Sequence, residues 1–516
     1  MLTAWAADFF CVRIALTNNF RCAIIIVQNS FGTERLFKMN YPVVFNIIGW
    51  LLCFDGAFML IPALTGLIYR ERAALWFLPA IAVCLIAGGL MVLFIKPKNK
   101  TIYAREGYVI VAMSWLVLSL FGALPFFLSG AIPEYIDALF ETVSGFTTTG
   151  ASILYSVEDM PKSMLMWRSF THWVGGMGVL VFVMAFIPLS GGSNMHIMKA
   201  ESTGPSVSKL MPGVKTTALV LYTIYFVMTL IQFVLHLFGG MTPFEAINTA
   251  FATAGTGGFG FRNDSMAGFS SYNRWVMTVF MLLFSLSFSS YYLLIKGKIK
   301  NAVTLEIKMF VLIVAVSTAV IVANIRDMFP DLREAVEHAA FTVSSVISTT
   351  GFSTRDFDEW PELSKTILVF LMFIGACAGS TGGGVKVSRL IILFKGMHKE
   401  LATMIHPKQL KKITMDGSPV SHEVVRSVNV YMVCFVLIFA ISMMIISFDG
   451  YDFETNFTAV AATINNIGPG LNAVGPAHNF EFFSVPAKLV LMFDMIAGRL
   501  ELYPMLLLLS PSTWKK

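Results

Sequence analysis

Thr147-Thr148-Thr149-Gly150 is the first of four short polar clusters that align along this sequence on one glycine each. The other three clusters are Gly255-Thr256-Gly257-Gly258, Ser348-Thr349-Thr350-Gly351 and Asn465-Asn466-Ile467-Gly468. Each cluster ends an amphipathic segment that is too short to cross a bilayer; these segments are 133–147, 243–255, 333–347 and 453–465. Because non-helical backbone at membrane depth is tolerated only inside protein or beside a water-filled cavity, each segment predicts a re-entrant hairpin. Four copies in register predict a repeated unit of helix, pore loop and helix.

The composition predicts an all-α polytopic membrane protein. Of the 516 residues, 56% are hydrophobic and only 13% are charged, about half the ~25% of a soluble domain. Such a chain has too few polar residues to cover a water-soluble fold, and no basic aromatic-rich module points to nucleic acid. Apolar stretches of spanning length occur at 41–69, 75–95, 107–130, 165–189, 215–239, 273–296, 307–325, 364–394, 423–448 and 486–510. We therefore expect two leading transmembrane helices followed by four helix–pore loop–helix repeats with pseudo-fourfold symmetry.

The predicted division of the chain follows from this repeat. Arg13, Arg21 and Arg35 interrupt the apolar pieces before Met39, and no secretory leader pattern is present there. The expected parts are an upstream extension (1–38), the two leading helices (39–100), pore repeat 1 (101–200), pore repeat 2 (201–300), pore repeat 3 with a broken second helix (301–415) and pore repeat 4 (416–516).

Basic residues gather in alternate loops and predict the orientation. They are Lys96, Lys98, Lys100 and Arg105, then Lys199 and Lys209, then Lys296, Lys298, Lys300 and Lys308, then Lys395, Lys399, Lys408, Lys411 and Lys412, and finally Lys515 and Lys516. All of them fall on one face if the spans alternate and the short segments do not cross. The positive-inside rule then predicts a multi-pass protein of the inner (plasma) membrane with both termini cytoplasmic.

The residue types in the clusters suit a cation that loses its water. Backbone carbonyl oxygens replace a hydration shell without a fixed charge that would trap the ion, and glycine allows the backbone angles that turn them inward. The preceding short helix directs its negative end toward the same place. Acids on the outer side, such as Glu141 and Asp264, are expected to concentrate cations. The predicted filter residues are Thr148, Thr149, Gly150, Thr256, Gly257, Gly258, Thr349, Thr350, Gly351, Asn466, Ile467 and Gly468; the alternative is four loops that merely tolerate glycine.

The stretch from Gly375 to Lys386 interrupts the apolar segment 364–394 with five glycines. Because glycine disfavours a helix by ~1 kcal/mol relative to alanine, this run predicts an unwound segment. We interpret it as a movable gate below the third cluster, formed by Gly379, Ser380, Thr381, Gly382, Gly383, Gly384 and Lys386. Close packing of small residues between helices is the alternative.

Two further polar residues stand inside apolar stretches. Arg499 lies midway along the last span, where a charge normally faces a cavity or a partner. We expect it to project into the pore below the filter as a barrier to cations; the alternative is an ion pair with Glu501 or Asp494. His172 beside Trp173 is interpreted as an interfacial residue rather than a proton relay.

Beyond the four clusters, three further motifs are notable: Arg168-Ser169-Phe170-Thr171-His172-Trp173 before Gly175-Gly176-Met177-Gly178, Ala378-Gly379-Ser380-Thr381-Gly382-Gly383-Gly384-Val385-Lys386, and Ala497-Gly498-Arg499-Leu500-Glu501. With the clusters, they make residues 39–516 resemble the Trk/Ktr potassium transporter superfamily, in particular its TrkH-type subunits. In related plant transporters a serine at the first-cluster glycine accompanies sodium preference, and here that residue is Gly150. The fourth cluster departs most from the family pattern.

This resemblance implies a non-enzymatic protein that carries K⁺ through a gated filter of backbone carbonyls. It also implies a homodimer in the lipid bilayer and a TrkA-type cytoplasmic nucleotide-binding regulatory subunit. We expect that subunit to dock on the loops after the sixth and eighth spans, the latter containing His406, Lys408, Lys411 and Lys412. An Na⁺- or H⁺-coupled potassium symporter is the alternative within transport, and an intramembrane hydrolase using Ser380 is the alternative outside it.

Overall fold

The computed structural model describes residues 39–98, 102–178, 214–407 and 412–514. Residues Tyr41–Ser510 form one compact unit; the other described residues, 39–40 and helix α24 (Pro511–Trp514), belong to a second unit. The predicted extension 1–38 lies outside the described residues, as do Lys100, Lys199, Lys209, Lys408, Lys411, Lys515 and Lys516.

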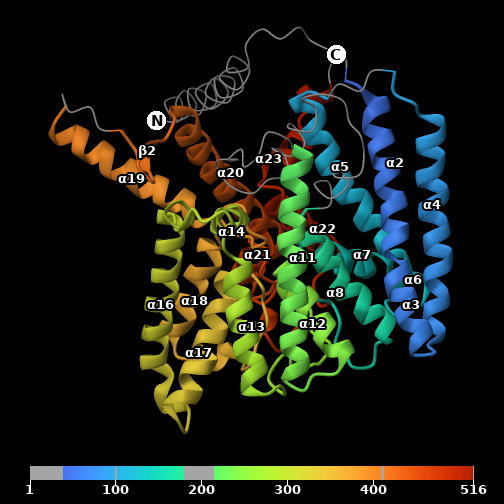
Figure 1. Ribbon diagram of the computed structural model, residues 1–516, viewed down its shortest axis with the longest axis horizontal. Coiled ribbons are helices and arrows are strands. Elements are labelled where there is room, and N and C mark those ends of the chain that lie inside the picture. The colour runs from blue at the N-terminus through green and yellow to red at the C-terminus, as the bar shows by residue number, and fades with distance from the viewer. Residues whose placement is uncertain (1–38, 99–101, 179–213, 408–411, 515–516) are drawn as a thin grey trace, which may run out of the picture. The chain divides into compact units, whose positions relative to one another are not determined.

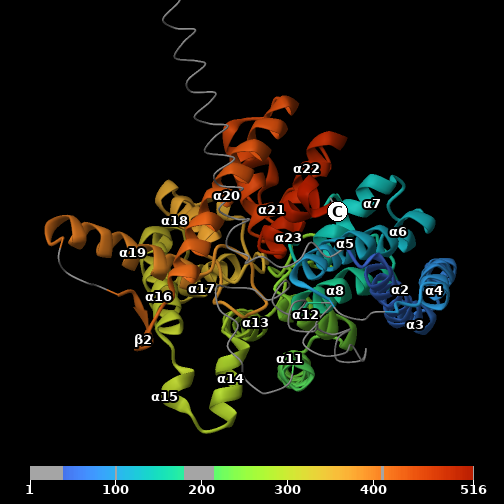
Figure 2. The ribbon, with the colours of Figure 1, turned by 90° about the horizontal axis from the view of Figure 1, so that it is seen from above.

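Six helical segments within the described residues are long and apolar enough to cross a membrane. They are Tyr41–Ile68, Arg72–Phe94, Ala104–Leu128, Thr216–Phe238, Leu305–Met328 and His422–Asp449. The first two are the predicted leading pair, and the other four are the first helices of the four predicted repeats. The fold is therefore the expected multi-pass helical one, and α2 lies beside α4 at one edge of the unit (Figures 1 and 2).

These six segments are built from several helices. The leading pair consists of α2 (Tyr41–Phe58), α3 (Leu60–Ile68), η1 (Arg72–Trp76) and α4 (Phe77–Phe94). The first helices of the repeats are α5 (Ala104–Gly122) with α6 (Leu124–Leu128), α11 (Val214–Phe238), α16 (Leu305–Ile325) with η2 (Arg326–Met328), and α20 (His422–Ile446) with η4 (Ser447–Asp449).

A short helix follows each of these first helices and stops at a polar cluster. These pore helices are α7 (Tyr135–Phe146), α12 (Pro243–Gly255), α17 (Leu332–Ile347) and α21 (Phe453–Ile464). The longest has 16 residues, or about 24 Å against a hydrocarbon core of about 30 Å. Capping fixes where two of them begin, because the side chains of Thr242 and Asp452 accept from the backbone N–H of Glu245 and Thr455. The predicted short segments are confirmed.

The second helices of the repeats differ from the prediction of continuous spans. In repeat 2, α13 (Ser271–Phe284) and α14 (Phe288–Ile295) meet at 91°. In repeat 4, α22 (Val485–Arg499) stops before α23 (Tyr503–Leu509). The continuous spans predicted at 273–296 and 486–510 are therefore wrong.

Each of these two breaks has a physical reason. In repeat 2 the freed backbone groups find partners, since Cys377 N–H donates to Ser285 O and Phe288 N–H donates to Gly379 O, each at 3.0 Å. In repeat 4, Pro504 has no N–H to donate to the carbonyl of Leu500, and its ring would clash with that carbonyl, so α22 cannot continue into α23 as one helix.

The break predicted in repeat 3 is confirmed. Helix α18 (Glu362–Ile374) ends where the glycine run begins, and α19 (Val387–Ile405) starts directly after Lys386. In repeat 1, α8 (Lys162–Gly176) is the second helix, and the end of the span predicted at 165–189 lies outside the described residues.

The remaining elements are small and lie in the connections. They are α15 (Ile299–Ala302), η3 (Phe357–Glu359), η5 (Asn472–Val474) and the antiparallel hairpin of β1 (Thr414–Met415) and β2 (Ser418–Pro419). Asp416 at the hairpin turn accepts the N–H of Leu305 at 2.7 Å, which ties the hairpin to the start of α16. Helix α19 extends away from the other helices in both views (Figures 1 and 2).

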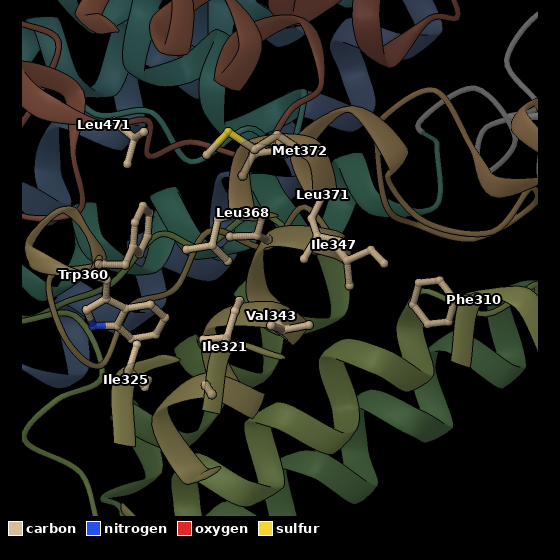
Figure 3. Packing of buried hydrophobic residues seen from close by; sticks show 14 of the residues in the cluster. Phe310, Ile321, Ile325, Val343, Ile347, Trp360, Leu368, Leu371, Met372 and Leu471 are labelled. Atoms are coloured by element: carbon tan, nitrogen blue, oxygen red, sulfur yellow. The ribbon is translucent and has the colours of Figure 1, made fainter. Parts of the chain in front are cut away.

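Apolar packing places the pore helix of repeat 3 between the two flanking helices of that repeat. Ile321 on α16, Val343 and Ile347 on α17, and Leu368 on α18 are fully buried in one cluster (Figure 3). Leu471, which follows the fourth polar cluster, belongs to the same core. Because such close contacts add up to a large dispersion attraction, they hold the end of α17 in one position relative to repeat 4.

Candidate functional site

The four polar clusters share one backbone conformation. Their aligned glycines, Gly150, Gly258, Gly351 and Gly468, have φ values of 82°, 80°, 82° and 98°. Two residues earlier, Thr148, Thr256, Thr349 and Asn466 have φ values of 55°, 56°, 60° and 56°. Left-handed backbone at a non-glycine residue is uncommon, so its recurrence at four equivalent positions shows a conformational repeat. Asn466 adopts this left-handed conformation in the fourth cluster, whose sequence departs most from the family pattern.

The clusters meet one another in a closed ring. A Cβ atom built on Gly150 would overlap the carbonyl oxygen of Gly257, and one on Gly258 would overlap that of Thr350. In the same way Gly351 faces the carbonyl oxygen of Ile467, and Gly468 faces that of Thr149. Each glycine therefore lies against the carbonyl of the next repeat, and the fourth repeat closes on the first. We call these eight residues, at the four glycines and the position before each, the glycine ring.

The glycine ring is shielded on its flanks and opens into a cavity on one side. The side chains of Thr148, Thr149, Thr256, Thr349 and Thr350 are buried. A cavity of about 180 Å³ is lined by the four aligned glycines and by residues that come after the clusters in the sequence, among them Arg168, Arg262, His478 and Asn479. The ring is thus the floor of a polar vestibule to which all four repeats contribute.

The α18–α19 loop (Gly375–Lys386) is hydrogen-bonded to the clusters of repeats 3 and 4. Gly383 N–H donates to Thr349 Oγ1 at 2.6 Å, and Gly384 N–H donates to Asn465 O at 3.1 Å. On another side, the hydroxyl of Thr381 donates to Phe284 O at the end of α13 at 3.1 Å. Inside the loop, the buried ammonium of Lys386 contacts Gly382 O. Of the predicted gate residues, Gly383 and Gly384 therefore lie directly against the clusters of repeats 3 and 4.

Arg499 contacts the same loop. Its guanidinium donates to Thr381 O at 2.6 Å and to Gly175 O and Gly176 O, at the end of α8, at 2.5 Å each. It stands at the last residue of α22 and not midway along a continuous span, which corrects the predicted placement. The two carboxylates considered as its partners have other contacts, because Glu501 pairs with Arg389 and Asp494 accepts from Ser442 Oγ at 2.8 Å.

Glu306, which the sequence did not single out, joins the two ends of the α18–α19 loop. Its Oε1 accepts the N–H of Ala378 at 2.8 Å and the N–H of Ser388 at 3.0 Å. A single carboxylate in the first turn of α16 thus fixes the loop where it begins and where it ends. Ser380, the residue of the hydrolase alternative, donates its hydroxyl to Cys377 O at 2.6 Å.

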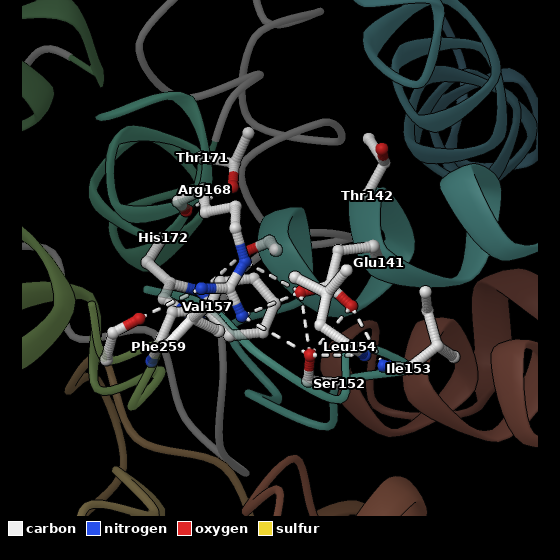
Figure 4. Close-up of polar contacts among 12 residues, drawn as sticks. Glu141, Thr142, Ser152, Ile153, Leu154, Val157, Arg168, Thr171, His172 and Phe259 are labelled. Carbon is white, nitrogen blue, oxygen red and sulfur yellow. Dashed lines mark hydrogen bonds and ion pairs between the residues drawn. The ribbon is translucent and has the colours of Figure 1, made fainter. Parts of the chain in front are cut away.

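Two sequence-based interpretations near the ring are wrong. Glu141, expected to be an outward acid, is only 1% exposed, and His172, expected to be interfacial, is fully buried. Both lie behind the first two clusters, where Glu141 pairs with Arg168 at 2.7 Å and His172 contacts Gly145 O at 2.7 Å (Figure 4). Asp264 is exposed, as expected.

The chain is similar to known proteins of a single family. A family model described as "Cation transport protein" (TrkH) matches residues 76–516. The chain is 34% identical over 492 residues to the Trk system potassium uptake protein TrkH of Vibrio parahaemolyticus, which covers 92% of this chain and 100% of the relative. It is 33% identical over 485 residues to TrkH of Escherichia coli K12, with 93% and 100% covered.

A solved structure agrees with these sequence relatives. The crystal structure of the potassium transporter TrkH from Vibrio parahaemolyticus matches with a TM-score of 0.83 at 32% identity, covering 92% of this chain and 100% of that one. The chain therefore belongs to the TrkH family of cation transport proteins.

Proposed function

We propose that this protein takes up potassium ions across the inner membrane, and that the glycine ring is the selectivity filter through which they pass. The observation that carries the proposal is the closed ring itself, in which each cluster glycine lies against the carbonyl of the next repeat. Carbonyl oxygens from four sides suit a monovalent cation that has lost its water. The relatives, which are named as potassium uptake proteins, support K⁺ as the ion.

The membrane potential supplies the driving force in this proposal. With both termini cytoplasmic, the lysine-rich loops lie inside and the vestibule opens outside. An inside-negative potential then contributes ~2.3 kcal/mol per charge per 100 mV, so inward K⁺ movement needs no coupled chemical step.

The α18–α19 loop and Arg499 form the gate below the filter. The loop contacts the clusters of repeats 3 and 4, while Arg499 reaches from the end of α22 to Thr381 O. A buried guanidinium in this position repels a cation that leaves the filter. Conduction then requires that the loop and Arg499 move away together.

A homodimer and a TrkA-type cytoplasmic ring complete the proposed system. Lys296, Lys298 and Lys300 near α15 are exposed, as are His406 and Lys412 after α19. The contact between Asp416 and the backbone of Leu305 holds these two connections together. They offer one basic surface, next to the start of α16 and the end of α19, on which a regulatory subunit docks.

Uptake of labelled Rb⁺ into liposomes that contain the purified protein tests the function. Wild type is expected to take up Rb⁺ down its gradient, to be inhibited by K⁺ and to be inhibited weakly by excess Na⁺. In Gly150→Ser the added side chain meets the carbonyl oxygen of Gly257, so Rb⁺ uptake falls and Na⁺ competes better. Absence of Rb⁺ uptake under every condition contradicts the proposal, and uptake that requires an Na⁺ or H⁺ gradient indicates a symporter instead.

Glu306→Ala is expected to raise Rb⁺ uptake by the protein without its regulatory subunit. The change removes two hydrogen bonds to a charged acceptor, each worth about 1.5–3 kcal/mol, so the closed loop becomes less stable relative to open conformations. Glu306→Gln keeps one acceptor oxygen and is expected to lie between wild type and alanine. Equal uptake by all three proteins contradicts a restraining role for Glu306.

A further inference from the structure

Glu141 holds the backbone that follows the first cluster. Its carboxylate accepts the N–H of Ile153 at 3.1 Å and the hydroxyl of Ser152 at 3.1 Å. It also accepts Arg168 Nε at 2.7 Å. With side chains of Glu141 and Arg168 0% and 2% exposed, the pair is removed from water on the vestibule side of the ring.

Arg168 and His172 hold the backbone that directly follows the second cluster. They stand one turn apart on α8, and the ring of Phe259, directly after Gly258, packs against both of them (Figure 4). The guanidinium lies 4.0 Å from the ring centre of Phe259, and its Nη1 donates to Gly260 O at 2.9 Å.

His172 reaches the second cluster directly. The N–H of Phe259 donates to His172 Nε2 at 3.2 Å, so Nδ1 carries the proton and donates to Gly145 O at the end of the first pore helix. A Cβ on Gly257 would overlap the imidazole. This histidine therefore joins the first pore helix to a residue of the glycine ring.

This arrangement is confined to one of the four repeats. Nine positions before the ring glycine, where repeat 1 has Glu141, the other repeats have Thr249, Thr342 and Ala459. All four side chains are buried, so the position tolerates small and neutral residues in the same packing. A buried ion pair is weak support for stability because desolvation offsets its attraction. A charged pair at one position of four therefore points to a role beyond packing.

We propose that Glu141, Arg168 and His172 act as a clamp that sets the position of the second cluster against the first and thereby determines how strictly the ring excludes Na⁺. The inference rests on the proposed function. The clamp residues touch backbone and not the ion, so they are positioning residues. Because carbonyl oxygens must stay apart to reject a smaller ion, fixing two of the four clusters from behind limits their approach toward Na⁺.

The test compares the Rb⁺ to Na⁺ uptake ratio of purified variants in liposomes. Arg168→Gln and His172→Phe remove hydrogen bonds to the two residues directly after the second cluster and are expected to lower the ratio about tenfold, the effect of losing one strong buried hydrogen bond. His172→Gln keeps an acceptor for Phe259 N–H and a donor for Gly145 O, and is expected to stay near wild type.

Arg274→Gln is the matched control. Arg274 on α13 pairs with Glu337 on α17 at 2.5 Å, again a second helix joined to a pore helix. Its other hydrogen bond goes to Ala267 O, and not to a cluster or to the two residues that follow one. We expect lower thermal stability with an unchanged ratio.

Three results overturn the clamp. The first is that Arg168→Gln and His172→Phe retain the wild-type ratio. The second is that Arg274→Gln lowers the ratio as much as they do. The third is that His172→Gln and His172→Phe change the ratio equally. If Arg168→Gln and His172→Phe do not fold, His172→Gln is compared with His172→Asn, which is expected to have a lower ratio, and equal ratios overturn the clamp. Failure of wild type to take up Rb⁺ contradicts the proposed function itself, and is thus distinct from failure of the clamp.

Discussion

Alanine at Gly258 is expected to lower labelled Rb⁺ uptake by about a hundredfold, as a misplacement of ~1 Å does in other positioned sites. The added methyl group would overlap the carbonyl oxygen of Thr350, and the φ of +80° disfavours any side chain there. The carbonyl must move aside, which opens the glycine ring at the joint between repeats 2 and 3. Uptake into liposomes, normalised to the amount of folded protein, measures the effect.

Gly240→Ala separates this effect from backbone strain alone. Gly240 has a φ of +82°, but a Cβ there would meet nothing within 4 Å. This control is expected to lose some stability and to transport like wild type. If both alanine variants transport equally, the ring of Gly258 and its neighbours does not form the ion path.

Removing the charge of Arg499 is expected to raise Rb⁺ uptake by about tenfold or more. Two unit charges ~8 Å apart at an effective dielectric constant of 20 repel by about 2 kcal/mol. Arg499→Ala and Arg499→Gln both abolish that repulsion, and both also free Thr381 O in the α18–α19 loop. Uptake by the protein without its regulatory subunit is the measurement.

Arg499→Lys distinguishes the effect of the positive charge from the effect of the hydrogen bonds. An ammonium group keeps the charge but cannot reproduce the forked contacts to Thr381 O, Gly175 O and Gly176 O. Uptake near the wild-type level indicates an electrostatic barrier, as we expect. If the lysine variant takes up Rb⁺ as fast as the alanine variant, the electrostatic barrier is contradicted. If uptake by the alanine variant is unchanged, Arg499 has no role in gating.

The sequence predicted the repeated parts of the fold because each carries a local pattern. A short amphipathic segment that stops at a Gly/Thr cluster determines both ends of a pore helix, and α12 begins and ends at the predicted residues 243 and 255. The break after Ile374 follows from five closely spaced glycines. Helix propensity and length suffice for these features.

The break between α13 and α14 could not be predicted in this way. The connecting residues Ser285, Leu286 and Ser287 include neither glycine nor proline. The backbone groups freed there are satisfied by Cys377 and Gly379 from repeat 3, and such tertiary partners are invisible in a single segment. The same holds for Glu306, because the residues whose N–H groups donate to it, Ala378 and Ser388, lie 72 and 82 residues away.

Charged residues were the least predictable part of the candidate site. Glu141 follows the pattern of an acid near the membrane surface, yet the fold buries it against Arg168, 27 residues further on. A sequence shows that two opposite charges exist, but whether each meets water or the other depends on how α7 and α8 pack. Only the structure supplies that pairing.

The hydrogen bonds from Gly383 and Gly384 to Thr349 Oγ1 and Asn465 O have a consequence for how ions are ranked. In the proposed gating, departure of the loop removes these donors from a hydroxyl and a carbonyl in two of the four clusters, and both groups then bind water or a passing ion. The polar groups around an ion bound above the closed pore therefore differ from those around an ion that crosses the open pore. The order of the alkali-metal ions by equilibrium affinity therefore need not match their order by rate of conduction.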